Sequence, residues 1–387
     1  MRKVFVILSI AIAALLSTSV FANVNDDQVT SQKIREADGT SGQDTNTGGG
    51  VKTGHIQDGA VTDAKIGGVI KVDKLATYVG MKIVHAGPVN GVDTFNTIND
   101  ALNAIATPDQ QTVIKIMPGT YSAPDLSIAN VIFEGSGREN TVLQGSASGG
   151  GGSKPAVFRG LTIDNIDSYA SITLDNAVCI SGMILRYEGV VNPSEAIHIK
   201  DSVAGWVESR ARTNIVNSVI DSISIYGHAD IRNSIINRFA ILNGESYKDS
   251  MITDTVVGVG AAPGTSGYAI GIFNWGASSG QTTLVNVRTM NVKTGLSVSS
   301  GVAVSVRGSN FEGTQFGVET GGSSIISLKD CTVKSTEHAI MINPNGFTPT
   351  VHVTNSQLIG TPVYNTTPVN VRLFNCYDGN INAIPNM

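Results

Sequence analysis

Residues 215–220 read IVNSVI and residues 231–236 read IRNSII, so one short order of residue types returns after a single step along the chain. The order is an apolar residue, an outward residue, Asn, Asp or Gly, a small residue, any residue, and then often an apolar residue. Its copies are centred on Gly135, Gly160, Asn176, Asp201, Asn217, Asn233, Asp249, Asn286, Gly308, Asp330, Asn355 and Asn375. This repeat decides the fold class.

The central position of the repeat predicts a bend. Asn, Asp and Gly are the residues that enter the left-handed αL region at least cost, so a position that accepts only these three indicates an αL turn between two strands. The preceding residue is often long and charged, as Arg232 is, and therefore faces solvent, whereas the residue before it is apolar and faces inward. Centres 16 to 37 residues apart fit a coil of two or three short strands per turn.

The coil predicts an all-β, single-stranded parallel β-helix. Rungs that stack at about 4.8 Å would make twelve copies a rod on the order of 55 Å long. A β-sandwich with repeated turns is the alternative, but it does not explain one recurring inward, outward and bend order.

The start of the repeat region has its own pattern. Apolar residues recur at helical spacing at Phe95, Ile98, Leu102 and Ile105. With Asp93 or Thr94 as the N-cap, they predict a short helix that covers the open end of the stack. A strand and turn follow, where residues 113–121 read VIKIMPGTY, and residues 131–137 read VIFEGSG. We therefore expect an N-terminal strand and capping helix over residues 76–110.

This order of helix, I-x-P-G-x-Y and an apolar run ending in G-S-G resembles the start of the pectin-lyase-like superfamily. That superfamily of right-handed parallel β-helices includes pectate lyases, pectin methylesterases and polygalacturonases. The resemblance covers roughly fifty residues, and it implies a right-handed β-helix over residues 111–387 rather than any one activity.

The first residues predict export. Arg2 and Lys3 precede the apolar run of residues 4–16, and residues 20–22 read VFA, a small-x-Ala-like cleavage site. Residues 1–22 are therefore interpreted as a signal peptide, with the mature chain beginning at Asn23. The apolar run is too short to span a bilayer comfortably, so no membrane span is expected after cleavage. The expected location is secreted, extracellular or on the outer cell surface, with the periplasm as an alternative.

Residues 23–75 differ from the rest in composition and carry a small repeat. Residues 29–34 read VTSQKI and residues 61–66 read VTDAKI. The segment of residues 56–66 resembles repeats in the stalks of bacterial surface proteins and phage tail fibres, which sometimes trimerise. A flexible low-complexity spacer is the preferred interpretation, and a stalk that forms a homotrimer is the alternative.

Charge and cysteine content exclude several classes of protein. Without Arg2 and Lys3 the chain has 24 basic and 31 acidic residues, so its negative net charge argues against nucleic acid as a partner. Only Cys179, Cys331 and Cys376 are present, which is no disulfide framework, and their spacing matches no metal site. We expect free thiols, no metal and no cofactor. Calcium, which pectate lyases bind near Asp residues, is indicated by no motif here.

The enzyme motifs of the resembling superfamily are missing. Residues 206–209 read WVES and lack the Asp and His of the pectate lyase W-x-D-H motif. Residues 227–230 read GHAD, a poor match to the G-H-G of polygalacturonases, whose adjacent Asp pair occurs here only at residues 26–27. No strand of the pectin methylesterase type appears. The sequence therefore predicts the fold of this superfamily without the active-site motifs of its three enzyme families.

One region nevertheless favours a carbohydrate site. Two intervals between successive repeat centres, after Asn176 and after Asp249, are unusually long. They predict loops at residues 187–195 and 258–281 that leave the rod on the same side, with a groove between them. The candidate residues along this groove are Trp206, Arg210, Tyr226, His228, Arg238, Asp254 and Trp275. Aromatic rings beside Arg, His and carboxylates suit stacking on a polysaccharide or cell-surface glycan, and Glu188, Glu195, Glu208 and Asp254 could serve acid or base roles.

Three functions follow in order of preference. The first is a glycan-binding or structural surface protein. The second is a polysaccharide lyase or hydrolase that acts in the groove. The third is an oligomeric fibre or adhesin head. A purely structural role is the alternative for the aromatic residues, which would then pack the loops onto the rod.

Overall fold

The structure, a computed structural model, describes residues 81–85, 93–186, 196–244, 249–261, 267–274, 281–343, 347–365 and 370–386. The expected signal peptide of residues 1–22 and the spacer of residues 23–75 lie outside the described residues. Export and trimer formation through these segments therefore stay predictions.

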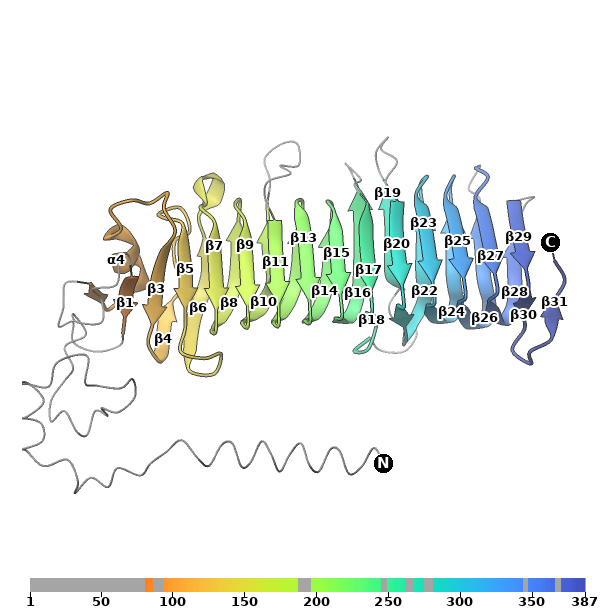
Figure 1. Ribbon diagram of the computed structural model, residues 1–387, viewed down its shortest axis with the longest axis horizontal. Helices are drawn as coiled ribbons and strands as arrows, with labels where there is room; N and C mark the ends of the chain where they lie inside the picture. The colour runs from red at the N-terminus through yellow and green to blue at the C-terminus, as the bar shows by residue number, and fades with distance from the viewer. Residues whose placement is uncertain are drawn as a thin grey trace, which may run out of the picture. The chain divides into compact units, whose positions relative to one another are not determined.

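Two long sheets, whose strands alternate along the coil in Figure 1, build the described part of the chain. The 15-stranded sheet consists, in spatial order, of β2 (Thr94–Phe95), β1 (Met81–Val84), β3 (Thr112–Ile116), β5 (Val131–Glu134), β7 (Ala156–Arg159), β9 (Ile172–Asp175), β11 (Ala196–Lys200), β13 (Arg212–Val216), β15 (Ala229–Arg232), β17 (Ser250–Thr253), β20 (Gln281–Val285), β23 (Ala303–Arg307), β25 (Ile325–Lys329), β27 (Thr350–Thr354) and β29 (Asn370–Phe374).

The 16-stranded sheet is formed by the strands between these. It consists of β4 (Gly119–Ser122), β6 (Thr141–Ser148), β8 (Thr162–Ser168), β10 (Val178–Leu185), β12 (Val203–Ser209), β14 (Val219–Ile225), β16 (Ile235–Gly244), β18 (Val256–Val257), β19 (Tyr268–Asn274), β21 (Arg288–Thr289), β22 (Val292–Ser299), β24 (Asn310–Gly321), β26 (Thr332–Asn343), β28 (Gln357–Asn365), β30 (Cys376–Tyr377) and β31 (Ala383–Ile384).

The chain alternates between the two sheets, and the neighbours within each sheet are parallel apart from the terminal pair β30 and β31. Such a coil is the predicted single-stranded parallel β-helix, so the expected fold class is confirmed. The step of 16 residues from Asn217 to Asn233 holds one strand of each sheet, β14 and β15.

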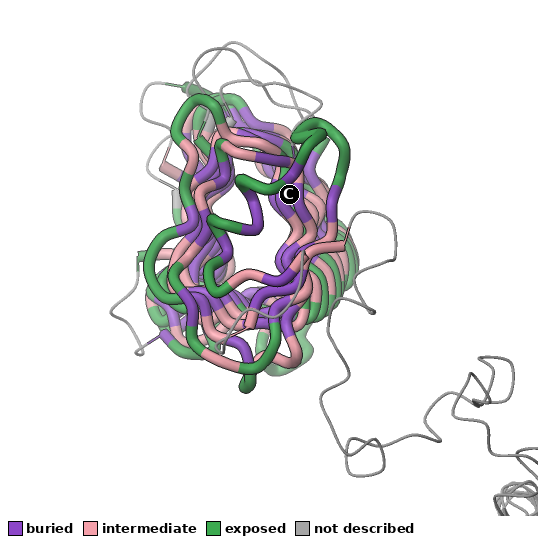
Figure 2. Tube along the Cα trace, turned by 90° about the vertical axis from the view of Figure 1, so that its left-hand side faces the viewer, coloured by how far each residue is buried: buried purple, intermediate pink, exposed green. Residues whose placement is uncertain are grey.

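The core lies inside the coil, and buried residues recur on every turn of the trace in Figure 2. In β3 the burial alternates between buried and partly exposed residues, as the period of a strand requires. Equivalent inward positions stack from rung to rung: Phe133 pairs with Phe158 in register, and their rings stack with centroids 5.1 Å apart. Packing of this kind, continued along the rod, supplies the stability that three cysteines do not.

The predicted bends are confirmed at all but one of the eleven positions from Gly160 to Asn375. Positive φ angles of 48–59° occur at Gly160, Asn176, Asp201, Asn217, Asn233, Asn286, Gly308, Asp330, Asn355 and Asn375. The bend predicted at Asp249 is wrong. The αL residue of that rung is Asp254, with φ 49°, directly after β17. Residues 252–255 read ITDT and carry the same order as residues 247–250, so the pattern matched twice within one rung. At the first copy, positive φ falls on Gly137 rather than Gly135.

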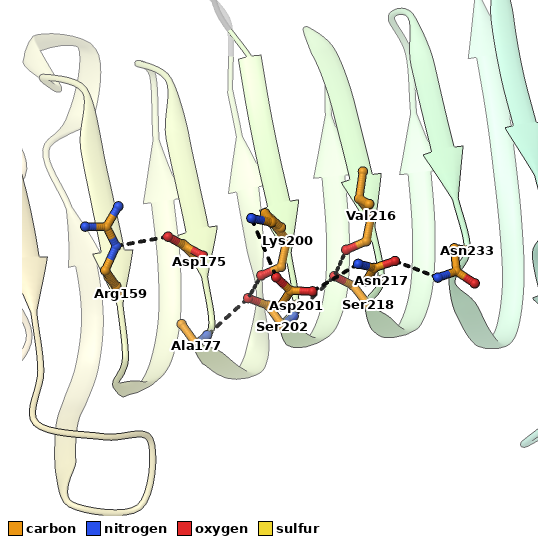
Figure 3. A network of polar contacts seen from close by, with 10 residues as sticks. All are labelled: Arg159, Asp175, Ala177, Lys200, Asp201, Ser202, Val216, Asn217, Ser218 and Asn233. Atoms are coloured by element: carbon orange, nitrogen blue, oxygen red, sulfur yellow. Dashed lines mark hydrogen bonds and ion pairs between the residues drawn. The ribbon is translucent and has the colours of Figure 1, made fainter. Parts of the chain in front are cut away.

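The side chains at the bends form two hydrogen-bonded ladders (Figure 3). Asn217 Nδ2 donates to Asp201 Oδ1 at 3.1 Å, and Asn233 Nδ2 donates to Asn217 Oδ1 at 2.6 Å. One residue further on, the backbone N–H of Ser202 donates to Ser218 Oγ at 3.2 Å, and Ser218 Oγ donates to the carbonyl of Val216 at 2.7 Å. The repeat therefore selects side chains that satisfy both the αL backbone and the neighbouring rung.

The predicted helix is α4 (Ile98–Asn103), at the N-terminal end of the coil in Figure 1. Its buried residues Ile98, Ala101 and Leu102 join the core, as expected of a cap. The predicted N-cap is wrong: the cap is Thr97, whose side chain accepts from the N–H of Asp100. Thr94 instead belongs to β2, which pairs with β1.

The three cysteines are free and buried. Cys331 and Cys376 occupy the ladder position after their bends, and Ser356 of the rung between them accepts a hydrogen bond from the N–H of Cys331 at 3.0 Å. The spacing of two rungs is thus as predicted. Burial raises the pKa of Cys179 to about 12, so its thiol stays protonated and unreactive at neutral pH. Across the described residues, no helix has the length and apolar character that crossing a membrane requires.

Candidate functional site

The candidate site lies on the outer side of the 16-stranded sheet. In β12 the inward residues Val207 and Ser209 are buried, and Trp206 and Glu208 are partly exposed. Register continues these outward positions into the next rungs, because Trp206 pairs with Ser222 of β14 and Ser222 pairs with Phe239 of β16. We call the surface formed by Trp206, Glu208, Arg210, Tyr226 and Phe239 the aromatic face.

Trp206 is a half-buried, fixed residue of this face. Its ring meets the ring of Phe239 edge-on, with centroids 5.8 Å apart and an interplanar angle of 71°. Ser222, which lies between them in register, is fully buried. The Trp206 ring therefore packs on the rod and still leaves part of its surface exposed.

Arg210 and Tyr226 form the second part of the aromatic face. Each follows directly after a strand of the 16-stranded sheet, and the N–H of Tyr226 donates to the carbonyl of Ser209 at 2.7 Å. The guanidinium carbon of Arg210 lies 5.4 Å from the centroid of the Tyr226 ring, a cation–π geometry. Two of the sequence-predicted residues are thus brought into contact, beside the strand that carries Trp206.

An acidic and basic cluster next to this face was only partly foreseen. Arg186 Nε donates to both carboxylate oxygens of Asp167, at 2.7 and 3.0 Å. The pKa of Arg186 is raised by the hydrogen bond and the charge of Asp167 and, more weakly, by Tyr169 and Glu208. Asp167 and Glu208 share one row through Ile184, which places them two rungs, roughly 9–10 Å, apart. Only Glu208 was named from sequence.

Arg238 is already engaged by a carboxylate. Its Nε donates to Asp221 Oδ2 at 2.7 Å, and Asp221 also accepts from the hydroxyl of Ser222 at 3.2 Å. The register shifts here, between the pair Ile220 and Ile236 and the pair formed by Ser222 and Phe239. Arg238 consequently lies beside the aromatic face but is held by an internal ion pair.

Two other candidates are placed away from the aromatic face. Asp254 is the αL bend described above, and its Oδ1 accepts from Asn286 Nδ2 at 2.7 Å, so it belongs to the ladder between the two sheets. His228 lies on the turn before β15, where burial and the nearby charge of Arg212 lower its pKa. It is therefore a neutral imidazole at pH 7 beside the 15-stranded sheet.

The walls of the expected groove fall largely outside the described residues. Trp275, Glu188 and Glu195 lie outside the described residues, as do residues 187–195 and much of 258–281.

The outer surface of the 16-stranded sheet continues beyond the aromatic face towards the C-terminus. Tyr268 and Phe273 of β19 make an edge-on contact with ring centroids 5.2 Å apart. Further on, burial raises the pKa of Glu319 in β24, against the lowering effects of Lys293 and Thr294. Glu319 shares the row of Glu208 but stands five rungs, about 24 Å, away, so these two cannot act as a carboxylate pair.

No group of three or more His, Cys, Asp or Glu side chains suited to a metal ion occurs within the described ranges. The functional groups on this surface are partly exposed aromatic rings, a stacked guanidinium and hydrogen-bonding carboxylates along successive rungs. Such a row can lie against an extended polymer and bond to its hydroxyl or carboxylate groups.

Comparison with known proteins finds similarity to solved structures only at low sequence identity. No protein-family model and no curated protein matches the chain. The Azotobacter vinelandii mannuronan C-5 epimerase AlgE4 A-module is similar at 13% identity and a TM-score of 0.49, over 68% of this chain and 91% of that one. The AlgE6 A-module of the same organism is similar at 15% identity and a TM-score of 0.42, over 73% and 96%.

Proposed function

We propose that the chain is an exported β-helix protein that binds an extended polysaccharide on its aromatic face. The observation that carries this proposal is the row of Trp206 and Phe239 on the outer surface, with the stacked pair of Arg210 and Tyr226 four residues further along the same strands. Partly exposed rings along the axis of a rod suit a ligand that is itself a chain.

The contacts indicate how the polymer is held. The apolar C–H face of a pyranose loses water against an aromatic ring, which favours stacking on Trp206 and Tyr226. Among the described residues no carboxylate pairs with Arg210, so its guanidinium can orient a uronate carboxylate in bidentate fashion. Arg186 and Arg238 contribute less, because Asp167 and Asp221 already occupy them.

The test measures binding of the mature chain to polygalacturonate, alginate and a neutral glucan by affinity electrophoresis and calorimetry. Tyr226→Ala removes a ring contact of about 1–1.5 kcal/mol, which corresponds to roughly tenfold weaker binding. Arg210→Ala should weaken binding to the two polyuronates more than binding to the glucan. The matched controls are Phe374→Ala and Arg307→Ala, exposed residues of the other sheet that should bind normally. Equal affinities for all four variants would refute the proposal.

Catalysis on the same surface is a second candidate, favoured by one observation. The strand positions of Asp167 and Glu208 are two rungs, roughly 9–10 Å, apart, and from such positions two side chains can reach carboxyl separations of the kind found in inverting glycoside hydrolases. Arg186 lies between them and bonds Asp167. Formation of new reducing ends or unsaturated products, with or without added calcium, that is lost in Glu208→Gln would promote this candidate over simple binding.

Export and assembly are proposed from the N-terminal sequence. Intact-mass measurement of secreted protein should find a chain that begins at Asn23. Light scattering with and without residues 23–75 distinguishes a spacer from a trimer-forming stalk.

A further inference from the structure

A row of mostly aliphatic side chains runs along the outer side of the 16-stranded sheet, close to the bends. Its members pair in register from one rung to the next, and they are Val142, Thr162, Val178, Val203, Val219, Ile235 and Val256. The six steps between these positions, at about 4.8 Å each, make the row roughly 29 Å long. We call this row the aliphatic stripe.

The aliphatic stripe faces solvent. Val203 and Ile235 are each 39% exposed, whereas the residues that follow them, Ala204 and Ile236, are buried, as the alternation of a strand requires. The other members of the stripe are partly exposed. The row therefore lies on the surface and is no part of the core.

Strand structure alone does not require aliphatic residues at this position. Beyond Val256 the same register position is held by polar residues, namely Arg288, Asn310, Thr332 and Gln357. The sheet continues through these rungs without needing Val or Ile there. A contiguous exposed apolar row that is confined to one stretch of a regular sheet marks a surface for interaction.

A bulge adds one more apolar side chain at the edge of the stripe. The register of β10 shifts after Cys179, and Ile180, two residues after Val178, is 56% exposed. Gly205 of the next rung makes room for this bulge, because a Cβ there would lie 2.6 Å from the carbonyl oxygen of Ile180. Bulges redirect side chains, and this one turns an aliphatic residue towards solvent.

The spacing of the stripe indicates its partner. Its side chains stand one rung, about 4.8 Å, apart, so the gaps between them fit a row of the same spacing along the whole length. A second copy of this chain offers such a row. A lipid surface fits less well, because the carboxylates of Asp201 and Asp221, which border the stripe on its two sides, would lose water against it.

Charges beside the stripe favour two parallel copies. A two-fold axis along the rod sets the bend side of one stripe against the opposite side of the other. Lys200 and Arg232 precede the bends, and their side chains are more than half exposed. Each would then come within one rung of Asp221 of the second copy. An antiparallel pair would bring each flank against the same flank and lose this complementarity.

We propose that the rod associates side by side with a second, parallel copy of this chain through the aliphatic stripe. Val203 and Ile235 pack at the apolar centre of the contact, and the charged flanks form its rim. The contact lies in the repeat region itself. It is therefore independent of glycan binding and distinct from assembly through residues 23–75.

The first test follows the mature chain by sedimentation velocity over a range of concentrations. The chain should associate, and Ile235→Arg should weaken association at least about tenfold, because it places a charge in the apolar centre. Arg288 holds the same register position in a later rung, so the substitution suits the fold. Ile325→Arg, at a 52% exposed position of the other sheet, is the matched control and should associate like the unmodified chain. Thermal unfolding checks that each variant is folded.

Cross-linking locates the contact. In parallel copies each Val203 faces its counterpart, so Val203→Cys should form an intermolecular disulfide under mild oxidation, and the control Ile325→Cys should not. The three native cysteines are buried and do not interfere. Adding Ile235→Arg to Val203→Cys should slow the cross-link at least about tenfold.

The outcomes separate this contact from assembly through the N-terminal segment. Association that survives Ile235→Arg while the cross-link of Val203→Cys is lost means that residues 23–75 also join the copies, and the stripe contact stands. A monomeric mature chain would overturn the proposal. So would a Val203→Cys cross-link that forms no faster than that of Ile325→Cys, or one that is unaffected by Ile235→Arg.

Discussion

Asn233 tests the physical basis of the coil. Its φ of 48° lies in the αL region, and its Nδ2 donates to Asn217 Oδ1 at 2.6 Å. Asn233→Val removes that hydrogen bond, worth about 0.5–1.5 kcal/mol, and forces a Cβ-branched residue into αL at roughly 1–2 kcal/mol. The free energy of unfolding should therefore fall by about 1.5–3.5 kcal/mol.

The comparison with Asn233→Gly isolates the backbone effect. Glycine adopts αL freely, so this variant loses the ladder hydrogen bond and gains conformational freedom in the unfolded state, which costs roughly 0.5–1 kcal/mol. Its free energy of unfolding should therefore lie about 1 kcal/mol above that of the Val variant. Arg232→Ala, one residue earlier, affects an exposed pair with Asp230 and should change stability little. Denaturant midpoints compare the three variants. Equal midpoints for the Val and Gly variants would refute the argument from αL strain.

Three further predictions concern the interior and one carboxyl group. Ser218→Ala should lower the free energy of unfolding by about 1–3 kcal/mol, because the buried N–H of Ser202 loses its acceptor. Ser218→Thr should leave it nearly unchanged, since Thr255 holds the equivalent place in its rung. Equal denaturant midpoints for the two variants would contradict this. Mass spectrometry of denatured, unreduced protein should find all three thiols alkylatable, and a Cys331–Cys376 bridge would show that the rungs are miscounted. The raised pKa of Glu319 means that the folded state binds the proton of this carboxyl group more tightly than the unfolded state does. The free energy of unfolding should therefore decline as pH rises from about 4.3 through the pKa of the folded state. Denaturant midpoints measured against pH should show this decline, and Glu319→Gln should abolish its part of it.

The coil could be predicted because its bends depend on single residues. Asn, Asp and Gly report the αL conformation directly, and the apolar position two residues earlier reports the inward side of a strand. The error at Asp249 shows where such local reasoning fails. Residues 247–250 and 252–255 carry the same order of residue types, and only pairing of β17 with β15 and β20 decides which Asp forms the bend.

The candidate site could be predicted only in part, because its neighbours are set by register. Arg210 and Tyr226 stand 16 residues apart, one regular rung, and their contact follows from the repeat. Arg186 and Asp167 are 19 residues apart, and Arg238 and Asp221 are 17 apart, on neighbouring strands of the 16-stranded sheet whose register shifts. The sequence does not reveal these register shifts, so it does not indicate which carboxylate faces which guanidinium.

The fluorescence of Trp206 tests the central claim most directly, because the chain has only two tryptophans. With Trp275→Phe in place, emission reports Trp206 alone, and a polysaccharide that binds the aromatic face should shift it in a saturable way. The Kd should equal the calorimetric value, and Tyr226→Ala should raise both together. Calorimetric binding with unchanged Trp206 emission would place the glycan elsewhere on the protein and contradict the account.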